Sequence, residues 1–213
     1  MNLAIEARRL ADYIQELNLP SEQETKSNNA YTHIGALYTN VILQAGLNYR
    51  TVVQPRVMHV LREYPNAHTV TGFMEVVKKD GIATVIKWKH PDKIDRMHRL
   101  LDFSKEMSIN TCEDLSDFLR NELNQEKFLG VKGIGNKTLD YTLKLLAFDT
   151  IAVDRHIYSF VEQAGLSIID YRTTKKVVEF AADILDVSRS AMDYRIWVYM
   201  SNKGNRQTTI QFS

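Results

Sequence analysis

Residues 128–165 read FLGVKGIGNKTLDYTLKLLAFDTIAVDRHIYSFVEQAG, and this stretch carries the features that decide the fold. Gly133 and Gly135 flank one aliphatic residue, Ile134, between two segments with apolar residues at helical spacing. Glycines permit positive φ and a tight reversal between packed helices, and we expect Ile134 to point into the core. The N–H groups after the turn open the next helix, whose positive end favours an anion such as a phosphodiester. A plain joint between two helices is the alternative.

Two polar side chains near this turn are candidates for catalysis. Lys137 lies two residues after Gly135, where the helix dipole and desolvation favour the neutral, nucleophilic amine. A solvated lysine is the alternative. Asp154 follows the apolar residues 150–153 and precedes a predicted helix, so we expect it to be an N-cap. A carboxylate fixed there can also stabilise positive charge in a cleft. We expect His156 to support the site or the fold and not to react itself.

The remainder of the chain is patterned for helices. Apolar residues recur at helical spacing in residues 3–17, 34–45, 53–64, 73–77, 94–101, 115–119, 139–147, 157–164, 177–185 and 191–200. The 213 residues include 9 glycines and 4 prolines, too few for a loop-rich β-sandwich. The sequence therefore predicts an all-α fold of roughly ten helices.

Composition excludes several classes of protein. The single cysteine, Cys112, rules out an intrachain disulfide and a cysteine-ligated iron–sulfur cluster, which needs four thiolates. We expect no metal site built from side chains. A lone free cysteine fits a reducing compartment. Glu6, Arg8 and Arg9 interrupt the apolar character of the amino end, and no apolar run approaches the ~18 residues of a membrane span. We therefore expect a cytoplasmic protein without membrane contacts.

The distribution of charge tells more than the total. Lys and Arg number 27 and Asp and Glu 26, so the net charge is +1, which argues weakly against binding to nucleic acid. Lysines and arginines nevertheless concentrate in residues 87–99 and 127–144. These two stretches can meet phosphates on an otherwise neutral protein. Scattered, solvated helix faces are the alternative interpretation.

Taken together, Gly133-x-Gly135-x-Lys137-Thr138 and the later Val-Asp-Arg-His at 153–156 resemble the helix-hairpin-helix (HhH-GPD) DNA glycosylase superfamily. The likeness is to its cluster-free, lysine-bearing members, which combine glycosylase and abasic-site lyase activity. It is closest over residues 128–165 and extends more loosely over 30–200.

This resemblance implies a specific domain organisation. Two helical subdomains would have a DNA-binding cleft between them. A six-helix barrel would span residues 30–148 and include the helix-hairpin-helix at about 120–148. Residues 1–29 and 149–213 would together form the second subdomain.

The resemblance also implies a reaction and assigns roles to residues. Lys137 would attack the sugar C1′ of a flipped nucleotide, form a Schiff base and allow β-elimination, while Asp154 would stabilise the cationic sugar. His156 would have a supporting role. Asn48, Tyr49 and Arg50 are the candidates for a wedge that fills the hole left by the base. Hairpin contacts to the DNA backbone are assigned to Lys132, Gly133, Ile134, Gly135, Asn136 and Thr138.

The implied partner is double-stranded DNA containing a damaged base or an abasic site, bound by a monomer. No cofactor is implied, although a monovalent cation often binds at the hairpin in this family. The late segment 193–200 is similar to the archaeal-type 8-oxoguanine glycosylases, which favours an oxidised purine as the lesion. Residues 149–153 lack the Gly or Pro that often precedes the aspartate in the superfamily.

Two further interpretations remain open from the sequence. The same fold can bind DNA without cutting it, as a helix-hairpin-helix module. The chain can also be a helical interaction protein with no role on DNA. Trapping of a covalent adduct separates the enzyme from the module, and salt-dependent binding to duplex DNA separates both from the third class.

Overall fold

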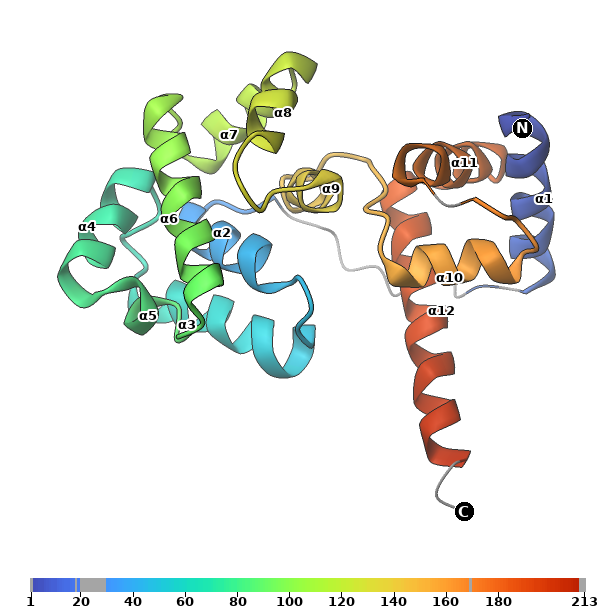
Figure 1. Cartoon of the computed structure of the whole chain (residues 1–213), viewed down its shortest axis with the longest axis horizontal. Coiled ribbons are helices and arrows are strands. Elements are labelled where there is room, and N and C mark those ends of the chain that lie inside the picture. Colours follow the sequence, from blue (N-terminus) through green and yellow to red (C-terminus); the bar gives the residue numbers. More distant parts are fainter. Residues whose placement is uncertain (1, 18, 20–29, 169, 211–213) are drawn as a thin grey trace. The chain divides into compact units, whose positions relative to one another are not determined.

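The computed structural model describes residues 2–17, 19, 30–168 and 170–210, with side chains described as far as Lys203. Every regular element within these residues is helical, which confirms the predicted all-α class (Figure 1). No helix in the described part of the chain is long and apolar enough to cross a bilayer.

The chain forms two compact units. Residues 29–146 make one of them, which we call the continuous unit, and residues 1–28 together with 147–213 make the other, the split unit. These boundaries differ by one or two residues from the division predicted at 30–148, and residues 20–29 of the predicted second subdomain lie outside the described part.

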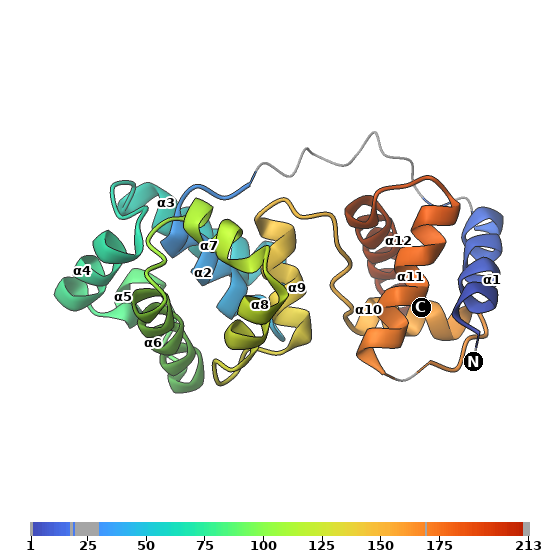
Figure 2. The same ribbon diagram turned by 90° about the horizontal axis from the view of Figure 1, so that it is seen from above.

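The continuous unit contains one π-helix, η2, among its α-helices. Its elements are α2 (Ile34–Leu43), η2 (Tyr49–Val53), α3 (Gln54–Glu63), α4 (Val70–Asp80), α5 (Ile82–Val85), α6 (Pro91–Glu106), α7 (Cys112–Leu119), α8 (Glu122–Leu129) and α9 (Asn136–Leu145). Helix α2 is the centre of this unit, because all ten of its residues are buried and α3, α4, α6 and α9 pack against it (Figure 2). A predominantly apolar helix must be enclosed by others on every face, and this explains the arrangement.

Several polar groups inside the continuous unit pair across its helices. The hydroxyls of Tyr38 on α2 and Ser104 on α6 are 2.6 Å apart, and Ser104 also donates to the Leu100 carbonyl. Asn40 of α2 accepts a hydrogen bond of 3.0 Å from the Tyr141 hydroxyl of α9. Because a buried polar group without a partner is costly, these bonds fix how α6 and α9 sit on α2.

The split unit combines both ends of the described chain. It consists of α1 (Leu3–Glu16), α10 (Arg155–Gln163), α11 (Tyr171–Ile184) and α12 (Arg189–Ile210). Helix α1 packs along α11, and α12 packs against both α10 and α11. The apolar face of α1, with Leu10 and Ile14, joins Phe160, Val177 and Ile196 in one core. Helix α12 is longer than the segment 191–200 predicted from apolar spacing.

Candidate functional site

The glycine turn (residues 130–135) reverses the chain between α8 and α9, as predicted. Gly133 has φ of +95°, which an L-residue adopts only with strain, whereas Gly135 is extended at φ −115°. Positive φ is therefore needed at the first of the two glycines only. Ile134 is 6% exposed, which confirms that it points into the core, and its N–H donates to the Val131 carbonyl.

The start of α9 has no side-chain cap. Gly135 occupies the N-cap position, where Ser, Thr, Asp or Asn would bond the first amides of the helix. The N–H groups of Lys132, Gly133, Gly135 and Asn136 have no hydrogen-bond partner among the described residues. That of Thr138 donates to the Gly135 carbonyl at 2.8 Å. Of the six residues predicted to contact a DNA backbone, Ile134 and Thr138 thus already use their N–H groups in hydrogen bonds to carbonyls of the turn.

Lys137 lies in the first turn of α9, half-buried, and its side chain has no hydrogen bond or ion pair within the described residues. Its helix is held in place one turn further on. Tyr141 donates to Asn40, and the Thr142 hydroxyl donates to the Thr138 carbonyl at 2.7 Å. The amine therefore lies at a fixed helix end and is not bonded to any residue in the described ranges.

Arg96 of α6 packs directly against the glycine turn. A Cβ placed on Gly133 would lie 2.7 Å from Nε, 2.8 Å from Cδ and 2.9 Å from Cγ of Arg96. A side chain at Gly133 would therefore displace Arg96, in addition to the strain of its positive φ. The basic stretch 87–99 and the glycine turn, separate in sequence, meet at this point.

Lys93 brings a second cation of α6 to the same place. Its ammonium donates to the carbonyls of Ile42 at 2.7 Å and Ala45 at 2.9 Å, which closes the carboxyl end of α2. Burial, together with the positive charges of Arg96 and Lys137, lowers the pKa of Lys93 to about 8. We call Lys93, Arg96, Lys132 and Lys137 the basic cluster.

The predicted wedge residues follow the end of α2 that Lys93 closes. Asn48 is the N-cap of η2 and accepts a hydrogen bond of 3.0 Å from the Thr51 N–H. Tyr49 is 39% exposed, and Arg50 is also exposed. Single π-helical turns occur frequently at functional sites, because they redirect side chains from the regular helical positions. Residues 46–52 lie between the two helical stretches predicted at 34–45 and 53–64, and nothing in the sequence indicated the π-turn.

Asp154 in the split unit is the N-cap of α10, as predicted. Its Oδ1 atom accepts hydrogen bonds from the N–H groups of His156 at 2.8 Å and Ile157 at 3.1 Å. The carboxylate is half-buried, and its Oδ2 atom has no partner in the described part of the chain. His156 thus contacts Asp154 through its backbone. One oxygen holds the helix and the other remains available for chemistry.

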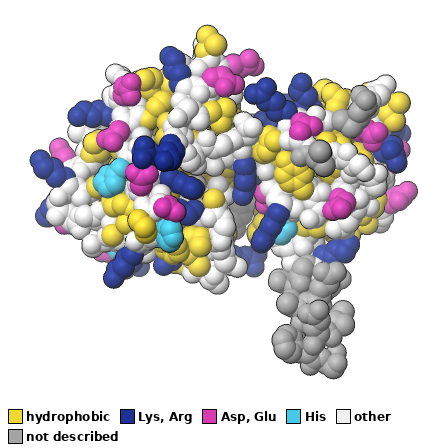
Figure 3. Space-filling model, viewed as in Figure 1, with side chains coloured by type: hydrophobic (Ala, Val, Ile, Leu, Met, Phe, Trp, Pro, Cys, Tyr) yellow, Lys and Arg dark blue, Asp and Glu magenta, His cyan; other side chains and the backbone are white. Residues whose placement is uncertain are grey.

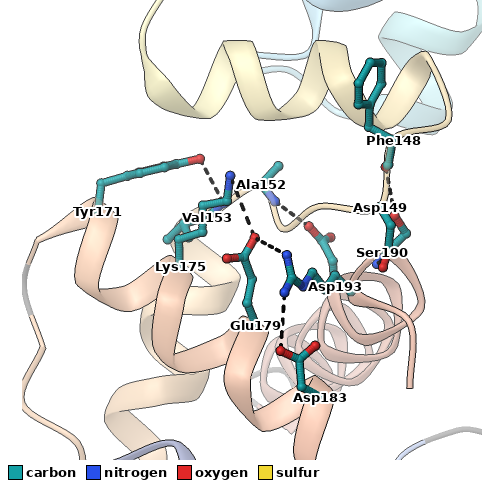
Figure 4. Close-up of polar contacts among 11 residues, drawn as sticks. Phe148, Asp149, Ala152, Val153, Tyr171, Lys175, Glu179, Asp183, Ser190 and Asp193 are labelled. Carbon is teal, nitrogen blue, oxygen red and sulfur yellow. Dashed lines mark hydrogen bonds and ion pairs between the residues drawn. The ribbon is translucent and has the colours of Figure 1, made fainter. Parts of the chain in front are cut away.

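The segment before Asp154 is held by side chains from α11 and α12 (Figure 4). The Ala152 N–H donates to Oδ2 of Asp193 at 2.7 Å, and the Val153 N–H donates to the Tyr171 hydroxyl at 3.2 Å. Further back, Ser190 donates its N–H to Asp149 at 2.8 Å. These bonds give a defined shape to a segment that lacks Gly and Pro.

An ion network fixes the two helices that supply those anchors. Arg189 at the start of α12 lies 3.3 Å from Asp183 and 3.9 Å from Glu179, both on α11. Glu179 also lies 3.8 Å from Lys175 on its own helix. Figure 4 shows Glu179 and Asp183 below the segment that contains Ala152 and Val153. Tyr171 and Asp193 are thus held relative to each other.

Sequence reasoning missed four residues that shape these two sites. Lys93 and Arg96 belong to a stretch recognised as basic, but nothing local placed them beside the glycine turn. Tyr171 and Asp193 contact residues 18 and 41 positions earlier in the chain. The one available signal was Asp193 itself, an acid within an apolar helical stripe, which is typical of a buried and satisfied carboxylate.

Two further observations concern the late segment 193–200 and possible metal ligands. Trp197 stacks on Tyr194, with ring centroids 6.3 Å apart, and Lys203 donates to Gln163 at 2.6 Å. The described residues contain no group of three or more His, Cys, Asp or Glu side chains that could hold a metal ion.

The sequence was also compared with models of known protein families. The family described as a domain of unknown function (DUF8548) matches residues 9–201. The match includes the glycine turn, Lys137 and Asp154, and it covers most of both units. This chain therefore belongs to the DUF8548 family.

Proposed function

We propose that this protein is a base-excision DNA glycosylase that also cleaves abasic sites, with Lys137 as the nucleophile. The observation that carries the proposal is the amino end of α9. There the Lys137 amine, which has no partner among the described residues, follows a turn in which the N–H groups of Gly133 and Gly135 also have none. In the proposal α8, the glycine turn and α9 are the helix-hairpin-helix, and the unpaired amides receive a DNA phosphate.

The proposed reaction begins with the neutral amine of Lys137 attacking C1′ of an extruded nucleotide. The bond from C1′ to the base breaks, and the base leaves with the electron pair and takes up a proton. Loss of a proton from nitrogen and opening of the sugar ring give a Schiff base to C1′. Removal of a 2′ proton then expels the 3′ phosphate, and water releases the lysine. The substrate class is an oxidised base in duplex DNA.

Asp154 has two roles in the proposal. Its Oδ1 atom keeps the start of α10 in place, and its Oδ2 atom stabilises the positive charge that develops on the sugar. Tyr171 and Asp193 are positioning residues, because they hold the backbone that leads to this carboxylate.

Borohydride trapping on duplexes with an abasic site or 8-oxoguanine tests this function. We expect a covalent adduct whose peptide map locates the DNA on Lys137. The adduct should disappear in Lys137→Gln and persist in Lys127→Gln, which removes an exposed lysine from α8. Trapping that is unchanged in Lys137→Gln excludes this lysine as the nucleophile.

A non-catalytic helix-hairpin-helix module is the second candidate. The observation that favours it is the N-cap role of Asp154, since capping alone accounts for an aspartate at this position. A module binds duplex DNA in a salt-dependent manner yet gives no adduct on any lesion.

A further inference from the structure

The cations of α6 divide into two stripes with different partners. Asp95 accepts a hydrogen bond of 2.8 Å from Arg99, and Asp92 lies 4.0 Å from the ring of His90. Asp92 and Asp95 thus lie on the same side of α6. Neither Lys93 nor Arg96, on the side that meets the glycine turn, has a carboxylate within ion-pair distance among the described residues.

Lys93, Arg96 and Lys137 lie close enough together for their positive charges to repel one another. The charges of Arg96 and Lys137 both act on Lys93, and the charge of Lys132 reaches Asp95, one position before Arg96. Figure 3 shows Lys and Arg side chains close together, with Asp and Glu side chains among them, over the part of the continuous unit where α6 runs. Like charges held together without a counterion lose stability, and an arriving anion removes that loss.

Lys93 is half-buried, and its ammonium group can donate one further hydrogen bond. Two of its three ammonium protons are directed at the Ile42 and Ala45 carbonyls, which leaves the third for another acceptor. Arg96 presents a planar fork of donors that suits a phosphate, braced by its stem against Gly133. The two side chains lie one turn apart on α6, beside the amides of the turn.

We propose that Arg96 and Lys93 bind the phosphodiester backbone of duplex DNA next to the phosphate held by the glycine turn. At a pH where the Lys93 amine is neutral in the free protein, binding is coupled to uptake of a proton by that amine. This inference rests on the proposed function only in that DNA is the partner. It holds equally for a catalytic and a non-catalytic protein.

The proton uptake follows from the surroundings of Lys93. The groups that face it are Arg96 on α6, Lys137 on α9 and two backbone carbonyls, that of Ile42 in α2 and that of Ala45 just after it. Helix α2 has no charged side chains. Helix α4 also packs on α6, but its Glu75 and Lys78 line a hollow with Lys105, at the far end of α6. An added phosphate favours the charged form and raises the pKa of Lys93 from about 8.

The direction in which DNA affinity changes with pH follows from the rise in the pKa of Lys93. Below pH 8 the free protein already carries the proton, so affinity does not depend on pH through this group. Above pH 8 the free amine loses its proton and the bound one keeps it, so affinity falls as pH rises. Between pH 7 and pH 9 the loss reaches about tenfold, since one pKa unit corresponds to a tenfold change in the equilibrium.

Fluorescence anisotropy with a duplex that carries a tetrahydrofuran abasic analogue tests the inference without Schiff-base chemistry. Arg96→Gln should make the slope of log K against log salt less negative by about 0.9, the value for one phosphate contact. Lys93→Arg keeps both carbonyl bonds and a permanent charge, so its affinity should not change between pH 7 and pH 9. Lys105→Gln, on the same helix, should match the wild type.

Each outcome decides something. If the wild type binds the duplex and both variants keep its salt slope and pH profile, this inference is wrong while DNA binding stands. If the wild type fails to bind the duplex, the proposed function fails as well. Displacement of the duplex by poly-glutamate at an equal charge concentration would assign the basic cluster to an acidic protein and overturn the inference.

Discussion

The Oδ2 atom of Asp193 accepts a 2.7 Å hydrogen bond from the N–H of Ala152, which joins α12 to the segment that ends at Asp154. Both residues are buried, so Asp193→Ala leaves an N–H group without a partner and away from water. We expect the free energy of unfolding in urea to fall by about 1–3 kcal/mol. Asp183→Ala, which breaks an exposed ion pair, should cost less than about 1 kcal/mol. Equal losses in the two variants would contradict the anchoring role.

Asp154 allows capping and catalysis to be separated. Asparagine caps a helix as well as aspartate, so Asp154→Asn should keep the stability of the wild type within a few tenths of a kcal/mol. Its rate of strand cleavage at an abasic site should nevertheless fall by about 10²- to 10³-fold, since the charge that stabilises the cationic sugar is gone. Asp154→Ala should lose both activity and about 1 kcal/mol of stability. Wild-type cleavage by the asparagine variant would refute the catalytic role.

Gly133 should be intolerant of any side chain. The φ of Gly133 is +95°, and a Cβ added there would lie 2.7 Å from Nε of Arg96. Gly133→Ala therefore combines backbone strain with a clash. We expect thermal and urea denaturation to show a loss of at least about 1 kcal/mol. In the double variant Gly133→Ala with Arg96→Ala the clash is removed, so part of that loss should be recovered. Simple additivity of the two single changes would show that Arg96 does not press on the turn.

Gly135, in contrast to Gly133, should tolerate a side chain. It is extended at φ −115° and has open space where a Cβ would be, so a side chain fits. Gly135→Asp supplies the missing cap to α9 and should raise stability by a few tenths of a kcal/mol. The same carboxylate occupies the amides proposed to bind phosphate. Duplex DNA binding, measured by anisotropy, should therefore weaken at least about tenfold, as for any lost charge-assisted contact. Unchanged affinity would place the phosphate elsewhere.

Tyr49 tests the proposed wedge. Its ring is 39% exposed, so Tyr49→Ala should change the free energy of unfolding by less than about 0.5 kcal/mol. In a duplex with 2-aminopurine opposite the lesion, the fluorescence change on binding should be strongly reduced, because no side chain fills the vacated stack. Met58→Ala, at another exposed apolar residue, provides the control. Identical fluorescence in the wild type and Tyr49→Ala would remove Tyr49 from this role.

Local signals predicted the local parts of both sites. The cap at Asp154, the start of α9 after Gly135 and the burial of Ile134 depend on neighbours within a few positions. Spacing and residue type report such short-range relationships well. The apolar stripe of α2 likewise predicted its helix, although the helix ends at Leu43, before the predicted residue 45.

Relationships across long stretches of chain could not be predicted in this way. Arg96 reaches Gly133, and Asp193 reaches Ala152, through packing that no single segment encodes. The basic character of residues 87–99 was visible, but its position beside the turn depends on how α6 and α9 both pack on α2. The π-turn at Tyr49 depends on the capping by Asn48 and on the path from α2 to α3.

The construction of the split unit from both ends of the chain has a consequence for biosynthesis. The continuous unit is complete on the ribosome while α10, α11 and α12 are still unmade, because domains fold as units during synthesis. Until α11 emerges, Leu10 and Ile14 of α1 have no core to enter and remain open to chaperones. The surroundings of Lys137 are thus folded before those of Asp154. Removal of α1 from the finished protein by proteolysis should destabilise the unit that holds Asp154 and leave the unit that holds Lys137 folded.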